Sequence, residues 1–132
     1  MFAELQCVVL DCPDPARLAR FYRAMLGGAV DRPDPRWEVN QDWSTLHLPN
    51  GTVLAFQRVA DHRPPRWPDP AHPQQFHLDF AVADLERADE QALALGATVL
   101  HDGDGRSWRV YADPAGHPFC LVRHSAPDAP EG

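Results

Sequence analysis

The two halves of this chain repeat one pattern, and this repeat restricts the possible folds more than any other feature of the sequence. Six pairs of equivalent residues occur in the same order in both halves, at separations that fall only from 70 to 65 residues. The pairs are Cys7 with His77, Asp14 with Asp84, Gly27 with Gly96, Trp43 with Trp108, Pro49 with Pro114, and Gly51 with Gly116. Ordered matches with so little drift indicate a tandem duplication.

Each copy predicts a strand, a helix and then further strands. In the first copy, residues 4–12 predict a strand, and a helix begins at the capping residue Asp14 and ends at Gly27. Residues 37–40 form a candidate short strand, and residues 43–58 predict a hairpin around the turn Pro49-Asn50-Gly51.

The second copy has the same order of elements. Residues 76–82 predict a strand, and Asp84 begins a helix that Gly96 ends, with Leu85, Ala88, Ala92 and Leu95 facing inward. A short strand at 98–100 and a hairpin at 107–123 follow. The predicted fold is therefore of the α+β class, with two tandem βαβββ modules.

The strand at 76–82 carries the most informative side chains. It alternates, so Phe76, Leu78, Phe80 and Val82 share one face, and His77, Asp79 and Ala81 share the other. We expect the following helix to cover the apolar face. His77 and Asp79 then point away from that helix.

A proline-rich stretch connects the two copies. Residues 59–75 contain Pro64, Pro65, Pro68, Pro70 and Pro73, which exclude a helix or a central strand. Trp67 in its middle favours a connection that packs against the protein, and a stiff surface spacer is the alternative. We expect a single domain over 1–124, with module 1 at 4–58 and module 2 at 76–124, and a flexible tail at 125–132.

Composition excludes several classes of function. The net charge of −7 argues against a nucleic-acid or anionic-membrane surface, and no apolar run reaches the roughly 20 residues of a membrane span. The N-terminus lacks the pattern of a secretory signal. The three cysteines lie in apolar runs and are odd in number, which favours a reducing cytoplasm over a disulfide framework.

The repeated modules resemble the vicinal oxygen chelate superfamily, which includes glyoxalase I, bleomycin-resistance proteins, fosfomycin-resistance enzymes and extradiol dioxygenases. The segments that carry the resemblance are 8–14 with 21–27, Phe76-His77-Leu78-Asp79-Phe80, and Asp113-Pro114-Ala115-Gly116 followed by the apolar strand to Leu121. The resemblance covers nearly all of 5–123. Within the superfamily the chain is similar to short bacterial glyoxalase-like proteins.

The resemblance implies a cleft between two curled sheets, with four inward positions. These correspond to Cys7, Ala55, His77 and Cys120, of which only His77 is a usual metal ligand of the family. The family's usual glutamate is missing from both last-strand positions, and in glyoxalase I that carboxylate also moves the substrate proton. Glyoxalase I activity is therefore not expected, and Asp79, next to His77 on the same face, is the nearest candidate base.

Two interpretations of the cysteines stay open. Cys7, His77 and Cys120 could form a sulfur–nitrogen site for a divalent metal such as Zn²⁺. Against this, buried free cysteine commonly packs as a small hydrophobic residue. Without a metal, His77 would line the cleft beside Asp79, and Asp79 could instead pair with an arginine such as Arg109.

Aromatic side chains are candidates for ligand contacts. Trp43, Trp67 and Trp108 could line a cleft for a planar molecule, although the equivalent positions of Trp43 and Trp108 also suit a shared packing role. Arg109 and Tyr111 on the strand of Trp108 are further candidate binding residues.

The sequence predicts a cytoplasmic protein that binds a small organic molecule, and the resemblance implies a homodimer. If the protein is an enzyme, we expect lyase- or isomerase-type proton transfer with Asp79 or His77 as the acid–base group. The alternatives are a non-catalytic protein of the bleomycin-resistance kind, which sequesters a drug or metabolite, and a metal-dependent lyase or transferase.

Overall fold

The computed structural model of the chain describes residues 1, 2 and 4–123, so the tail predicted at 125–132 lies outside the described residues. The chain forms two compact units, Met1–Arg63 and Pro64–Gly132. Their boundary falls inside the connection that the sequence predicts at 59–75. The single domain over 1–124 and the cleft between the modules remain predictions.

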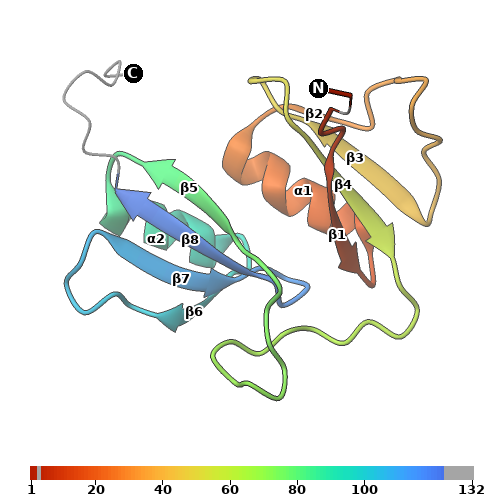
Figure 1. Cartoon of the computed structure of the whole chain (residues 1–132). Helices are drawn as coiled ribbons and strands as arrows, with labels where there is room; N and C mark the ends of the chain where they lie inside the picture. Colours follow the sequence, from red (N-terminus) through yellow and green to blue (C-terminus); the bar gives the residue numbers. More distant parts are fainter. Residues whose placement is uncertain (3, 124–132) are drawn as a thin grey trace. The chain divides into compact units, whose positions relative to one another are not determined.

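The first unit is a four-stranded mixed sheet with one helix (Figure 1). Its elements are β1 (Val8–Cys12), α1 (Pro15–Leu26), β2 (Ala29–Val30), β3 (Trp43–His47) and β4 (Val53–Arg58). The strand order is β1-β4-β3-β2; β1 and β4 run parallel, and the other neighbours are antiparallel.

The second unit repeats this topology (Figure 1). Its elements are β5 (Leu78–Val82), α2 (Leu85–Ala94), β6 (Thr98–His101), β7 (Trp108–Ala112) and β8 (Pro118–Arg123). The order is β5-β8-β7-β6, again with the first pair parallel and the others antiparallel. The predicted α+β class and the tandem βαβββ modules are confirmed.

Equivalent aspartates begin the two helices, as the sequence predicts. The side chain of Asp14 accepts from the backbone N–H of Arg17, and that of Asp84 accepts from the N–H of Arg87. Each carboxylate thereby satisfies one of the N–H groups that a helix leaves unpaired at its start. The first helix ends at Gly27, whose φ of 76° favours glycine.

The two helices attach to their sheets differently. Helix α1 buries a continuous apolar stripe, consisting of Pro15, Leu18, Ala19, Phe21 and Tyr22. Helix α2 buries only Leu85 and Ala92, and the predicted inward position of Leu95 is wrong, because the helix ends at Ala94 and Leu95 is exposed. Polar contacts attach α2 to its sheet.

Three strand predictions need correction. The strand predicted at 4–12 begins only at Val8, and the one at 76–82 begins only at Leu78, because pairing with the neighbouring strand starts there. Phe76 consequently lies before β5 and is exposed. Residues 37–40 form no strand, because the only backbone pairing in this segment is an isolated bridge between Asn40 and Trp43. The edge strand of the sheet is formed by Ala29–Val30 instead.

The part of the proline-rich connection that begins at Pro64 packs against the second unit. Gly116 leaves room for Pro64, since a Cβ there would lie 2.4 Å from the proline side chain. Trp67 makes an edge contact with the ring of His101, with centroids 6.4 Å apart. The contact with His101 agrees with the prediction that Trp67 packs against the protein. Over the described residues, we find no helix with the length and apolar character needed to cross a bilayer.

Candidate functional site

The two faces of the second sheet differ in what covers them. The register pairs Asp79 with Cys120 and Val110 with Cys120, and paired residues point to the same face. The opposite face carries Phe119 stacked on Tyr111, and the Tyr111 hydroxyl reaches Asp89 on α2. Asp79 and Cys120 therefore lie on the face that α2 does not cover.

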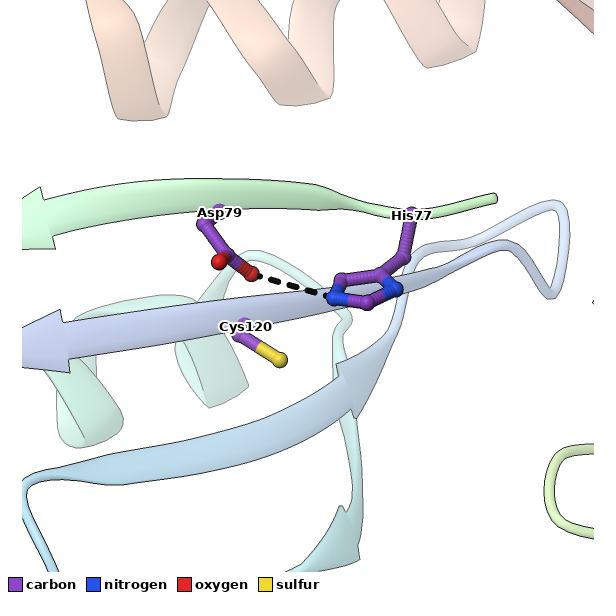
Figure 2. Close-up of side chains that lie close together, drawn as sticks. All are labelled: His77, Asp79 and Cys120. Carbon is purple, nitrogen blue, oxygen red and sulfur yellow. Dashed lines mark ion pairs between the residues drawn. The ribbon is translucent and has the colours of Figure 1, made fainter.

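Three side chains that the sequence predicts as site residues lie close together on this face (Figure 2). His77, Asp79 and Cys120 each offer a ligand atom, and these atoms lie within 4.8 Å of one another. His77 Nε2 is 3.3 Å from Asp79 Oδ1, and the two side chains are 41% and 61% exposed. The cluster, which we call the His77 site, is thus open to a ligand from solvent.

Burial and charge keep the Cys120 thiol protonated. Burial, the charge of Asp79 and a hydrogen bond to Asp79 together raise the pKa of Cys120 to about 11, and burial is the largest of these causes. A thiol with this pKa is a weak nucleophile near neutral pH. In the absence of a metal, Cys120 therefore acts at this site as a hydrogen-bond donor to Asp79.

The donor set of the His77 site suits a divalent metal such as Zn²⁺. Imidazole nitrogen, carboxylate oxygen and thiolate sulfur are all zinc ligands, and in a tetrahedral zinc site ligand atoms lie about 3.5 Å apart. The observed ligand atoms lie within 4.8 Å of one another, so the side chains would have to move closer together to hold one ion. Binding would require the thiol to lose its proton, so affinity would rise with pH.

The observed cluster differs from the predicted metal set in one member. Asp79 stands beside His77 and Cys120, whereas Cys7 belongs to the first unit. Cys7 directly precedes β1, where it lines an open pocket of about 260 Å³ with residues 5–8 and 50–53. Its part in a metal site remains a prediction.

Arg109 and Tyr111 lie on the helix side of the sheet. Arg109 forms an ion pair with Glu86 and has a second contact of 3.4 Å to Asp89. The Tyr111 hydroxyl donates to Asp89 at 2.6 Å, and burial raises the pKa of Tyr111 above its usual value. Arg109 is therefore not the partner of Asp79 that the sequence left open, and a ligand-binding role for either residue remains a prediction.

Two of the predicted tryptophans contact the same histidine. The ring centroid of His101 lies 6.4 Å from that of Trp67 and 5.3 Å from that of Trp108. The register places Trp108 on the same face as Cys120, since Trp108 and Val110 are two residues apart on β7. The position of His101 beside these tryptophans follows from packing and has no signal in residue spacing.

The remaining predicted residue, Trp43, lies on β3 of the first unit. Its indole Nε1 is buried and has no hydrogen-bond partner among the described residues 1, 2 and 4–123. Ala55, at the position equivalent to Cys120, pairs with Val9, so the first sheet has an apolar pair where the second has Asp79 and Cys120.

Comparison with known proteins agrees with this architecture. The family model of the glyoxalase-like domain matches residues 7–122. A search of curated protein sequences finds no significant match. A search of solved structures finds many matches. The three that are described next have low sequence identity to this chain.

Three of these structures illustrate the similarity. A hypothetical protein from S. aureus is 16% identical with a TM-score of 0.66, and the match covers 94% of this chain and 100% of that one. A glyoxalase/bleomycin resistance protein/dioxygenase family enzyme from Burkholderia phytofirmans is 16% identical with a TM-score of 0.67, covering 92% and 98%. The fosfomycin resistance protein FosX from Listeria monocytogenes is 14% identical with a TM-score of 0.65, covering 95% and 96%.

At these identities the solved structures establish the fold alone, whereas the family model spans most of the sequence. The chain therefore belongs to the glyoxalase-like domain family, within the vicinal oxygen chelate superfamily.

Proposed function

We propose that this protein binds a small organic molecule at the His77 site and transfers a proton to or from it. The observation that supports this most directly is the contact of 3.3 Å between His77 Nε2 and Asp79 Oδ1 on an uncovered sheet face. A carboxylate in contact with one imidazole nitrogen fixes the tautomer of the ring and its orientation. The other nitrogen, Nδ1, is then the basic atom.

Each member of the site has a role in this proposal. His77 Nδ1 takes or returns the proton, Asp79 stabilises the imidazolium that forms, and the protonated thiol of Cys120 donates to Asp79. A proton moved between two carbons gives an isomerase, and a proton removed beside a leaving group gives a lyase. The rings of Trp67 and Trp108 supply a surface for a planar ligand.

The test is a ligand and turnover survey with matched variants. Fosfomycin and bleomycin belong in the panel because proteins of this fold are named for resistance to them. For a ligand that is turned over, we expect His77→Gln and Asp79→Asn to lower kcat by about 10²–10⁴-fold, the usual contribution of acid–base catalysis. Ligand affinity should change little.

Glu90→Gln is the matched control, because Glu90 is an exposed carboxylate on α2. It should retain wild-type turnover. Full turnover in both His77→Gln and Asp79→Asn would contradict the proposed roles. Tight binding with no turnover in the wild-type protein would instead favour sequestration of the ligand, as in a protein of the bleomycin-resistance kind.

A metal-dependent lyase or transferase is the second candidate, and the donor set of the His77 site favours it. In that case His77, Asp79 and Cys120 would hold the ion, which would polarise a substrate oxygen as a Lewis acid. Elemental analysis of protein purified without chelator should then give close to one metal per chain. The His77→Gln variant should lose it, and Glu90→Gln should keep it.

Two further expectations concern the setting of the protein. The resemblance to the superfamily supports a homodimer, which light scattering at several concentrations would test. The odd number of cysteines supports the cytoplasm as the compartment.

A further inference from the structure

A row of apolar side chains lies beside the His77 site on the same face of the second sheet. The register pairs Ala81 with Val122 and Val122 with Trp108, so these residues form a row across β5, β8 and β7. Ala81 and Val122 each lie two residues after a member of the His77 site on their strands, which puts them on its face. We call Ala81, Val122 and Trp108 the apolar row.

The apolar row is accessible, whereas the residues that alternate with it are covered by α2. Ala81 is exposed, and Val122 and Trp108 are half-buried. Leu121, which precedes Val122 and points to the opposite face, is only 2% exposed. The row therefore offers accessible apolar surface next to the exposed side chains of the His77 site.

Trp108 closes one end of the row. Its ring centroid lies 5.3 Å from that of His101 and 5.6 Å from the guanidinium carbon of Arg106, and these contacts hold the indole in place. Neighbouring strands are about 4.8 Å apart, so the row spans about 10 Å from Ala81 to Trp108. A phenyl ring with a short chain fits this length.

The equivalent row of the first unit has a different composition. Its register pairs Asp11 with Gln57 and Gln57 with Trp43. Asp11 and Gln57 are exposed polar residues, as expected where one face of a sheet meets water. At these two positions the second unit has Ala81 and Val122. An accessible apolar row in place of a polar one indicates contact with an apolar group.

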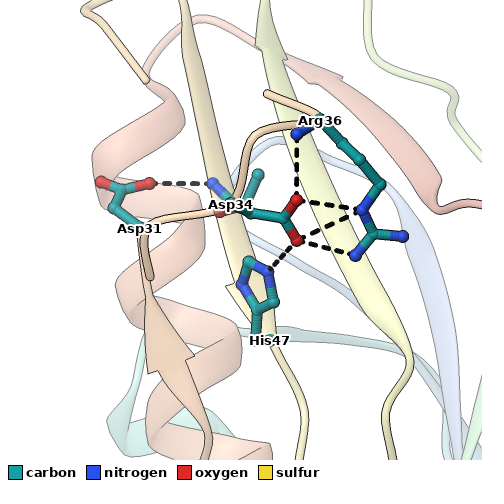
Figure 3. A network of polar contacts seen from close by, with 5 residues as sticks. Asp31, Asp34, Arg36 and His47 are labelled. Carbon is teal, nitrogen blue, oxygen red and sulfur yellow. Dashed lines mark hydrogen bonds and ion pairs between the residues drawn. The ribbon is translucent and has the colours of Figure 1, made fainter. Parts of the chain in front are cut away.

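The first unit also covers part of its equivalent face with its own chain. The register of β3 and β4 puts His47 on this face. Asp34 Oδ2 lies 3.2 Å from His47 Nε2 and accepts from Arg36 Nη2 at 2.7 Å (Figure 3). The connection that carries Asp34 runs over 31–42, whereas the equivalent connection of the second unit runs only over 102–107. The shorter connection leaves the apolar row accessible.

We propose that the substrate of the His77 site is a carbonyl compound with an aromatic ring two or three carbons from the carbonyl group. The ring lies on the apolar row, and the carbon that exchanges a proton lies at His77 and Asp79. Successive positions on one face of a strand are about 6.6 Å apart, which sets this short separation. The inference rests on the proton transfer proposed for the site and adds the class of substrate.

A matched pair of ketones tests the requirement for the ring. 4-Phenyl-2-butanone and 2-butanone both have exchangeable C–H groups beside a carbonyl, and only the first has a phenyl ring. Titration of the full-length ¹⁵N-labelled protein with 4-phenyl-2-butanone should move the backbone N–H signals of residues 120–122 saturably. 2-Butanone should bind at least about tenfold more weakly, because it has no ring to bury on the apolar row.

Matched valine substitutions in one sheet test the position of the ring. Val122→Thr keeps the shape of the side chain and adds a hydroxyl, so it should weaken 4-phenyl-2-butanone by about fivefold and change the affinity for 2-butanone little. Val99→Thr is the control, because Val99 is exposed on β6 and pairs with Tyr111 on the opposite face. It should bind both ketones like the wild type. If Val122→Thr does not fold, Ala81→Asn at an exposed position should weaken the phenyl ketone in the same way.

Exchange of the ketone C–H groups in D₂O, followed by proton NMR of the probe, separates this inference from the proposed function. Tight binding of the phenyl ketone that Val122→Thr weakens, without any exchange, would support the apolar row and contradict proton transfer at the His77 site. Exchange that His77→Gln slows, with equal affinity for both ketones, would support proton transfer and overturn the inference. The inference is also overturned if neither ketone moves the signals of residues 120–122, or if Val122→Thr and Ala81→Asn bind the phenyl ketone like the wild type.

Discussion

The two units have one topology but opposite chemistry on the sheet face that their helix leaves uncovered. In the first unit, the central parallel pair carries Val9 opposite Ala55; in the second, the same positions carry Asp79 opposite Cys120. Ala55 is fully buried, whereas its equivalent Cys120 is partly exposed. The two sheets therefore share their strand pairing and differ at positions that a ligand could contact.

The helix-facing layers of the two units are more alike. Equivalent positions on the last strand carry Leu54 and Phe119, and both side chains are buried. A comparable layer in each unit explains how one topology tolerates different chemistry on its other face. The comparison separates residues that specify the fold from residues that specify the site.

The largest effect should come from truncating this shared layer. Phe119→Ala should lower the free energy of unfolding by about 3–5 kcal/mol and Leu54→Ala by about 2–5 kcal/mol, because each leaves a cavity in a packed layer. Urea unfolding followed by circular dichroism measures both. Val99→Ala is the control at an exposed apolar position and should stay within about 0.5 kcal/mol of the wild type. A cost below 1 kcal/mol for Phe119→Ala would contradict the layer's role.

A reciprocal exchange tests the faces that differ. Ala55→Cys adds an atom at a fully buried position and should destabilise by about 1–3 kcal/mol through overpacking. Cys120→Ala removes the same atom from a partly exposed position and should cost less than about 1 kcal/mol. Equal losses of stability for the two substitutions in the same unfolding assay would contradict the proposed difference in packing between positions 55 and 120.

A smaller effect should distinguish how the helices are attached. Position 46 of the first unit carries leucine, and its equivalent in the second is Tyr111, whose hydroxyl donates to Asp89 on α2. Tyr111→Phe should cost about 1–2 kcal/mol, the contribution of a hydrogen bond to a charged acceptor that Arg109 still contacts. Thermal unfolding measures this cost. Asp89→Asn should lower the stability less in the Tyr111→Phe background than in the wild type, because the two residues interact.

The fold could be predicted because the repeat, the caps and the alternation agree with one another. Asp14 and Asp84 cap their helices, and the strand around Asp79 alternates as expected. The errors lie where local signals are weak. A strand's first residues depend on whether a neighbour pairs with them, and the inward position of Leu95 depended on a helix that ends one residue earlier.

The site could be predicted only in part. Alternation was enough to put His77 and Asp79 on one face, whereas Cys120 came from the resemblance to the superfamily. The contacts of Arg109 with α2 depend on how the helix packs, which the sequence does not encode locally. Residue types predict candidates, and packing determines which of them have partners.

The smallest effect concerns pH and again separates the two sheets. The pKa of Cys120 is raised from 9.0 to about 11, so the folded protein keeps a proton that the unfolded chain loses. The stability that this proton contributes is fully present below pH 9 and is lost as pH rises from 9 to 11. Solvent reduces the effect because Cys120 is only partly buried.

Urea midpoints at pH 8, 9, 10 and 11 measure this loss. Cys120→Ala should show a shallower decline than the wild type over this interval, because it lacks the titrating thiol. Asp79→Asn should fall between them, since the Asp79 charge is one cause of the raised pKa and burial is the larger one. Equal slopes in all three proteins would mean that the second sheet does not hold Cys120 protonated, and the chemical contrast with Ala55 would then reduce to a difference in size.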